Sequence, residues 1–162
     1  MNTEDEKNIF GHNLQILINQ RNWSIKQAAE EIGYDRNDLS KILVGSKNFT
    51  LETAIKFSRF FNISLFLLFC RLFNSEKYRT SFPFVDTQYM CVIRKNFQLL
   101  SAKQAAIDMD SSTVSHIMHG RRKNPTINTL YKIADGASVS LDELLKTEQD
   151  KQKEISLEEG EE

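Results

Sequence analysis

The chain has 162 residues, of which 40% are hydrophobic and 27% are charged, a composition that excludes a disordered or fibrous protein. Its length fits one ordinary domain or two very small ones. Lysine and arginine number 21 against 22 acids, and this net charge of −1 argues against a protein that coats nucleic acid by bulk charge. Residues 146–162 carry seven acidic and three basic side chains, so an acidic tail masks a slightly basic body.

Cysteine usage and the apolar runs indicate the compartment. Cys70 and Cys91 are too few for a disulfide framework, which favours a reducing environment. Both cysteines lie in apolar stretches, and we expect Cys91 to be buried. The N-terminus has no signal-peptide core, and the most apolar run, residues 63–73, is too short to span a bilayer. We therefore expect a cytoplasmic protein without a membrane span.

The chain repeats itself at an offset of 75 to 77 residues. Residues 23–29 (WSIKQAA) match residues 100–106 (LSAKQAA), and residues 39–45 (LSKILVG) match residues 114–120 (VSHIMHG). Shorter matches follow at residues 51–53 and 127–129, and at residues 63–65 and 139–141. Matches in one order at a nearly constant offset predict two copies of one unit of about 60 residues.

Each unit is predicted to contain five short helices. In the first unit the helices open at N-cap residues, in chain order Thr3 with Glu6, Ser24 with Gln27, Asp35, Thr50 and Ser64. Gly33 and Gly45 are expected to end the second and third helices. In the second unit a helix around residues 86–97 comes first, and the later helices open at Ser101 with Gln104, Ser111, Thr126, and Ser140 with Glu143.

These elements predict an all-α fold of two tandem five-helix units packed together. Unit one covers residues 1–73, a joint covers residues 74–86, unit two covers residues 87–146, and an acidic tail covers residues 147–162. Within the joint, residues 82–85 cannot form a regular helix because Pro83 breaks it, so a short extended segment is expected there. The tail is short of apolar residues, which predicts a frayed segment or a solvated helix end.

Eight of the eleven phenylalanines lie within residues 57–84. The fifth helix of unit one is apolar on nearly every side, and such a helix is normally buried. A unit of this size has little room for it in its own core. Packing against unit two would make the chain an internal pseudo-dimer, whereas packing against another chain would make a homodimer. We favour the internal interface, with the chain acting as a monomer.

The units resemble the phage-repressor (lambda repressor and Cro-like, XRE) family of helix-turn-helix proteins. The resemblance covers roughly residues 8–70 and 88–146, and the residues that carry it are Ala28-Ala29, Ile32-Gly33, Leu39 to Ile42 and Gly45 in unit one and residues 120–127 (GRRKNPTI) in unit two. It implies binding to double-stranded DNA, with the first turn of each third helix in the major groove. Unit two departs from the pattern, because two residues are missing between Ala106 and Val114 and Asp110 replaces the turn glycine.

In unit one the resemblance places Arg36 and Asn37 against base edges, and Ser40, Lys41 and Lys47 follow them. Arginine pairs bidentately with guanine and asparagine with adenine. Asp38 counts against this interpretation, because a carboxylate at the groove repels phosphate. In unit two the third helix carries Ser111, Ser112, Thr113, Ser115, His116 and His119. Arg121, Arg122 and Lys123 come just after it, where phosphate contacts are expected.

The sequence therefore predicts a non-catalytic, double-stranded DNA-binding protein, a transcriptional regulator that uses two recognition helices in one chain. An accessory DNA-binding protein of a plasmid or other mobile element is an alternative with the same binding physics. A protein-interaction module, such as an antitoxin or adaptor, is an alternative of another class. We recognise no catalytic set and no cofactor site, and His116 with His119 lacks a third ligand for a metal. The DNA sequence and the mutual orientation of the units stay open.

Overall fold

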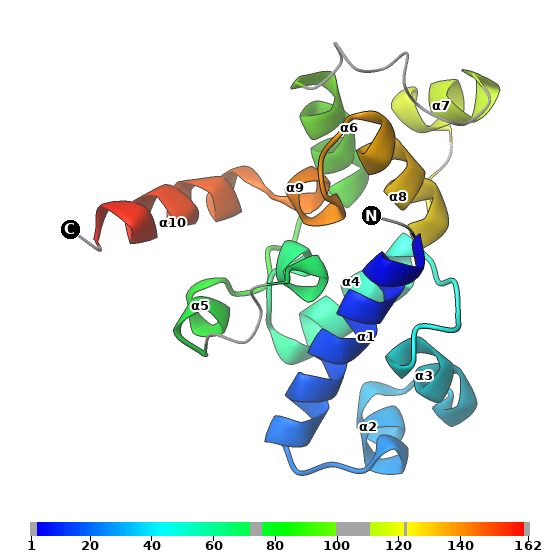
Figure 1. The fold of residues 1–162 in the computed structure, drawn as a ribbon, viewed down its shortest axis with the longest axis vertical. Helices are drawn as coiled ribbons and strands as arrows, with labels where there is room; N and C mark the ends of the chain where they lie inside the picture. The colour runs from blue at the N-terminus through cyan, green and yellow to red at the C-terminus, as the bar shows by residue number, and fades with distance from the viewer. Residues whose placement is uncertain (1–2, 72–75, 100–110, 122, 161–162) are drawn as a thin grey trace.

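The computed structural model describes residues 3–71, 76–99, 111–121 and 123–160. In these ranges every regular element is a helix, which confirms the predicted all-α class (Figure 1). The helices are α1 (Thr3–Gln20), α2 (Ile25–Ile32), α3 (Arg36–Leu43), α4 (Leu51–Phe61), the 3₁₀ helix η1 (Leu65–Phe69), α5 (Glu76–Ser81), α6 (Tyr89–Leu99), α7 (Ser111–Met118), α8 (Ile127–Gly136), α9 (Leu141–Leu145) and α10 (Glu148–Glu159). None of the described helices is long and apolar enough to cross a membrane.

Three predicted helix starts in the N-terminal unit are capped as expected, and Thr126 likewise caps α8 by accepting from the Thr129 amide at 3.4 Å. The Ser24 hydroxyl accepts a hydrogen bond from the Gln27 amide at 3.1 Å, and the Gln27 side chain accepts one from the Ser24 amide at 3.0 Å. Asp35 and Thr50 each accept from the amide three residues later, at 2.9 and 3.4 Å. Each bond satisfies an amide that a helix start leaves without an intrahelical partner, so these side chains set where α2, α3 and α4 begin.

Two other predicted caps are wrong. Ser64 and Ser140 stand before η1 and α9, but neither side chain forms a capping hydrogen bond with the helix that follows. The Ser64 hydroxyl instead donates to the Asp150 carboxylate at 2.8 Å, 86 residues further along the chain. The fifth element of the N-terminal part is also a single 3₁₀ segment rather than the predicted α-helix. A 3₁₀ helix of five residues is longer than most, and here the surrounding core holds the segment in place.

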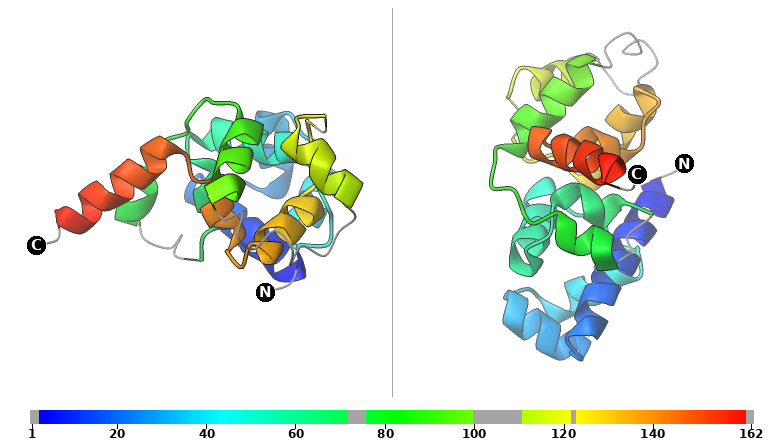
Figure 2. Two further views of the ribbon diagram at one scale, coloured as in Figure 1. Left: turned by 90° about the horizontal axis from the view of Figure 1, so that it is seen from above. Right: turned by 90° about the vertical axis from the view of Figure 1, so that its left-hand side faces the viewer.

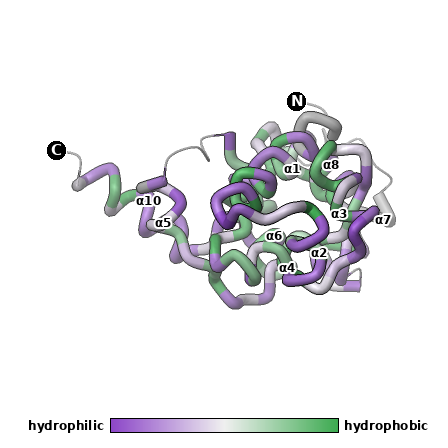
Figure 3. Tube along the Cα trace, turned by 90° about the horizontal axis from the view of Figure 1, so that it is seen from below, coloured by the Kyte–Doolittle hydropathy of each residue, from purple (hydrophilic) through white to green (hydrophobic). Residues whose placement is uncertain are grey.

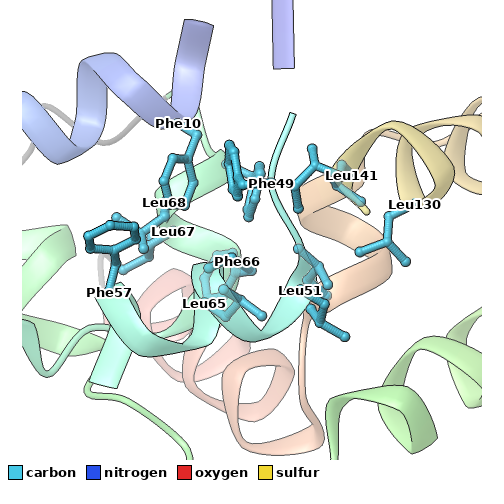
Figure 4. Close-up of a cluster of buried hydrophobic side chains, with 14 of the residues drawn as sticks. Phe10, Phe49, Leu51, Phe57, Leu65, Phe66, Leu67, Leu68, Leu130 and Leu141 are labelled. Carbon is cyan, nitrogen blue, oxygen red and sulfur yellow. The ribbon is translucent and has the colours of Figure 1, made fainter. Parts of the chain in front are cut away.

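Aromatic side chains fill the centre of the molecule. Phe10 is fully buried, and its ring centroid lies 4.7 Å from that of Phe49 and 5.0 Å from that of Phe69. All five side chains of η1 are buried, and η1 packs against α1, α4 and α9. Figure 4 shows this cluster continuing from Phe10 through η1 to Leu130 and Leu141. The apolar segment therefore packs within the chain, as the sequence predicts.

A buried asparagine anchors the last element in each part of the chain. Asn13 in α1 donates its amide to the carbonyl oxygens of Leu68 and Cys70, both at 3.0 Å. Asn96 in α6 donates likewise to Leu144 and Lys146, at 2.8 and 2.9 Å. The accepting carbonyls are 76 residues apart in the sequence, which is the offset of the repeat. Each asparagine thus satisfies buried carbonyls that have no helical partner.

The segment between the two parts differs from the prediction in three respects. The joint contains the short helix α5 ahead of residues 82–85, which were expected to be extended. Helix α6 begins at Tyr89 rather than near residue 86. Its buried side chains form one stripe, namely Tyr89, Ile93, Asn96 and Phe97. Cys91 lies off this stripe and is exposed, so the prediction of a buried Cys91 is wrong.

The acidic tail forms helix α10, which projects away from the body of the molecule (Figure 2). Its first turn is anchored rather than frayed, because Thr147 and Asp150 form a capping box and Asp150 is only 2% exposed. Further along the helix, Glu154 accepts a hydrogen bond from the Tyr78 hydroxyl in α5 at 3.0 Å. The tail is therefore a solvated helix whose base is fixed to the fold.

The buried Asp150 carboxyl predicts a specific pH dependence of stability. Burial raises its pKa above the ordinary value of 3.8, although the Thr147 amide and the Ser64 hydroxyl bond to it. The folded chain then binds this proton more tightly than the unfolded chain, so the contribution of Asp150 to stability falls as pH rises through the raised pKa. We expect Asp150→Asn, which does not titrate, to gain stability relative to the wild type from below pH 3.8 to neutral pH.

Urea unfolding at a series of pH values measures this difference. Ser64→Ala serves as a control, because it removes one hydrogen bond to the carboxyl but leaves the titrating group in place. A difference between Asp150→Asn and the wild type that stays constant with pH would contradict the expected result.

Candidate nucleic-acid interface

Helices α2 and α3 are short and are joined by a tight turn. Gly33 ends α2 in the left-handed conformation, with φ of 75°, and its amide donates to the Ala29 carbonyl at 2.9 Å. Glycine adopts this conformation without the steric cost that a side chain brings. The Lys56 ammonium in α4 donates to the Gly33 carbonyl at 2.8 Å, which ties the turn to the body. Leu39 and Ile42 are fully buried, so one face of α3 is fixed against the core.

Helix α1 crosses the end of α3 at very short distance. Gly11 in α1 is buried, and a Cβ placed on it would lie 2.5 Å from the Leu43 carbonyl oxygen. No side chain fits at that distance from a backbone atom, so glycine at position 11 allows this crossing. The contact sets how far α3 stands out from the body.

The outer face of α3 carries the residues that the sequence places against DNA. Arg36, Asn37 and Lys41 are exposed, and Ser40 is half-exposed. Arginine and asparagine at the first two positions of a helix can reach past its end toward a groove. This face of α3 is accessible to solvent, so a partner can reach all four predicted residues of the helix.

Asp38 and Lys47 form an ion pair at the edge of this face. Their charged atoms lie 2.7 Å apart, and both side chains are about one-third exposed. The hydrogen-bonded Lys47 ammonium lowers the pKa of the Asp38 carboxyl, and the carboxylate in turn raises the pKa of Lys47. Lys47 therefore compensates the charge that counted against DNA binding. It is also less available to phosphate than the sequence alone indicates.

Comparison with known proteins assigns this part of the chain. Residues 14–68 match the helix-turn-helix family model. These residues are similar to helix-turn-helix domains. This is a family of DNA-binding domains, and the prediction for the N-terminal unit is confirmed at that level. A search of curated proteins and a search of solved structures found no match.

The C-terminal part presents a second set of polar residues beyond the helix-turn-helix domain. On α7, His116 is exposed and Ser115 is half-exposed. His119 follows the helix, with its Nδ1 2.8 Å from the Ser115 carbonyl oxygen. Gly120 turns the chain with φ of 74°, and Arg121 and Lys123 after it are exposed. The side chains of Ser111, Ser112 and Thr113, the whole of Arg122, and the expected helix from Ser101 lie outside the described residues.

Helices α3 and α7 lie toward the same side of the molecule, near opposite ends of its long axis (Figure 1). Helices α5 and α10 lie on the other side, and the view from below agrees (Figure 3). In that view the hydrophobic stretches gather in the body, while most of α10 is hydrophilic. The acidic helix α10 is therefore remote from both helices that carry predicted DNA contacts.

The sequence analysis missed two asparagines, one in the loop after α3 and one in the loop after α7. Asn48 accepts a hydrogen bond from the Asn128 amide at 3.2 Å, and Asn124 accepts one from the Glu52 amide at 3.0 Å. An isolated antiparallel bridge between Thr50 and Thr126 lies between these bonds. We call residues 48–52 with residues 124–128 the reciprocal bridge. The available signal was the pattern Asn-x-Thr, which begins at residues 48 and 124, one repeat offset apart.

Proposed function

We propose that this chain is a non-catalytic, double-stranded DNA-binding protein that regulates transcription and holds two recognition helices, α3 and α7, on one duplex. The helix-turn-helix match of residues 14–68 supports DNA binding by the N-terminal part. The observation that carries the two-helix proposal is the reciprocal bridge, which joins the starts of α4 and α8, the helices that follow α3 and α7. One chain then occupies a site that otherwise takes two protomers.

Each part has a distinct task in this proposal. Arg36 and Asn37 read base edges in the major groove, where a bidentate arginine selects guanine and asparagine selects adenine. Arg121 and Lys123 contact phosphates beside α7, which adds affinity and fixes the register of the protein on DNA. The ion pair of Lys47 with Asp38 leaves the N-terminal part with fewer available cations. Phosphate binding therefore depends more on the C-terminal part.

Fluorescence anisotropy of labelled duplexes at several salt concentrations tests the proposal. Duplexes of about 30 base pairs suffice, because adjacent major-groove segments on one face lie roughly 34 Å apart. We expect binding whose logarithm falls linearly with the logarithm of the salt concentration, and tighter binding to the DNA upstream of the protein's own gene. Equal binding to all duplexes favours the accessory role on a mobile element. Absence of binding at low salt would favour the protein-interaction module.

Replacing Arg121 and Lys123 by alanine, singly and together, is expected to weaken binding to every duplex alike. Each lost phosphate contact lowers the slope of the salt dependence by about 0.9, because fewer counterions are released. Lys153→Ala is the matched control, since it removes one exposed cation from α10 on the side away from α3 and α7. Unchanged slopes in the double variant would show that these residues do not contact phosphate.

A further inference from the structure

We infer that a local two-fold axis relates the two DNA-contacting parts of this chain, and that its target is an inverted pair of unlike half-sites at a fixed spacing. The inference rests on the proposed function and adds the geometry of the DNA. In a two-fold contact the same residues face each other, so every interaction occurs twice with donor and acceptor exchanged. In a head-to-tail arrangement each interaction occurs once. The hydrogen bonds of the bridge distinguish the two cases.

Backbone bonds of the reciprocal bridge occur in exchanged pairs. The Leu51 amide donates to the Pro125 carbonyl at 2.9 Å, and the Ile127 amide donates to the Phe49 carbonyl at 2.8 Å. Leu51 and Ile127 are equivalent in the repeat, and so are Phe49 and Pro125. The bridge is antiparallel, which is the direction that a two-fold axis through it requires.

The side chains of the bridge follow the same rule. Asn124 caps the start of α4 by accepting from the Glu52 amide, and Asn48 caps the start of α8 by accepting from the Asn128 amide. Asn48 and Asn124 are equivalent, as are Glu52 and Asn128. Each part therefore uses an asparagine side chain to cap the start of a helix in the other part. The four bonds therefore form two exchanged pairs, one between backbone atoms and one that involves the asparagine side chains.

A second contact, away from the bridge, fits the same axis. Elements η1 and α9 occupy equivalent positions in the repeat, and they pack against each other. Their positions are fixed by Asn13 and Asn96, which bond equivalent carbonyls. Equivalent segments therefore meet at two separate places, as a two-fold axis through both requires. The contact of α1 with α8 departs from this symmetry, because the described residues of α4 and α6 make no contact of similar extent. The sequences differ at these places, because η1 reads LFLLF and α9 reads LDELL. The symmetry therefore relates the backbones of the two parts and not their side chains.

The two-fold axis determines the relative orientation of the two DNA half-sites. Recognition helices related by a two-fold axis read the two strands in opposite directions, so their half-sites are inverted. The half under α3 faces Arg36 and Asn37, whose pairing depends on base identity. The half under α7 faces Ser115 and His116 and lies beside Arg121 and Lys123, which favour phosphate contacts. We therefore expect one strict and one tolerant half-site.

Selection of duplexes from a random pool by the full chain, followed by sequencing, tests the inference. The selected half-sites are then rebuilt in inverted and direct orientation and with the spacer changed by whole base pairs. We expect the inverted duplex at the selected spacing to bind about tenfold or more tightly than the others, because only there do both helices engage one duplex. Equal or tighter binding of the direct repeat overturns the two-fold inference while leaving DNA binding intact. Failure to bind any duplex at low salt overturns the proposed function itself.

A variant of the bridge gives a second readout. Asn48→Ala/Asn124→Ala removes both exchanged caps, and we expect it to lose most of the discrimination between spacer lengths while still binding the strict half-site. Asn19→Ala is the control, because Asn19 is an exposed residue that bonds Gln15 within α1. Full spacer discrimination in the double variant would show that the bridge does not set the spacing.

Discussion

Phe66→Ala is expected to lower the free energy of unfolding by about 3–5 kcal/mol, the usual cost of removing a buried aromatic side chain. Phe66 is fully buried in η1, where this helix packs against α9. Its ring lies edge-on to Phe82 at a centroid distance of 5.1 Å, and the Lys146 ammonium lies 5.4 Å above it. Truncation would leave a cavity at the contact between the two parts of the chain. Urea unfolding followed by circular dichroism measures the loss.

Two further variants keep this prediction testable if Phe66→Ala folds poorly. Phe66→Leu retains most of the volume and is expected to cost less. Phe60→Ala removes the same side chain from a half-buried position beside Trp23, and it is also expected to cost less. An equal loss for Phe60→Ala and Phe66→Ala would contradict the role of η1 as the packed contact between the parts.

Arg36→Ala is expected to weaken binding to the preferred duplex by about 1–3 kcal/mol, the range for one bidentate contact between a side chain and a base. Binding to unrelated duplexes should change far less, because it depends on phosphate contacts. Arg36 is exposed at the first position of α3, so its removal leaves the core intact. Anisotropy titrations with preferred and scrambled duplexes at one salt concentration measure both effects.

Arg21→Ala is the matched control for this experiment. Its guanidinium lies 5.0 Å from the Trp23 ring centroid and 4.8 Å from that of Phe61, away from α3. We expect its DNA affinity to stay close to that of the wild type. If Arg36→Ala weakened binding to both duplexes equally, Arg36 would contact phosphate rather than a base.

Local signals in the sequence were sufficient for much of the fold. Ser24 with Gln27, Asp35 and Thr50 cap their helices as expected, because such bonds join residues three apart and depend on little else. The pattern Asn-x-Thr at residues 48 and 124 was an available signal, but the sequence analysis missed both asparagines and their role. That role depends on an approach of two segments that no local pattern describes.

Two of the wrong predictions share one physical cause. The Ser64 hydroxyl bonds Asp150 instead of its own helix, because folding places that carboxylate within 2.8 Å. Cys91 is exposed because the stripe from Tyr89 to Phe97 fixes which side of α6 faces the core. In both cases a tertiary contact overrides a local preference. The same holds at the candidate site, where Lys47 is engaged by Asp38 in a way that its loop sequence does not reveal.

The stoichiometry of the DNA complex tests the central claim most directly. Size-exclusion chromatography with light scattering on the full chain and a selected duplex gives the number of chains bound. The account predicts one 18.8-kDa chain per duplex, with both half-sites protected on that duplex. Two chains per duplex, or a single protected half-site, would contradict the claim that one chain supplies both recognition helices.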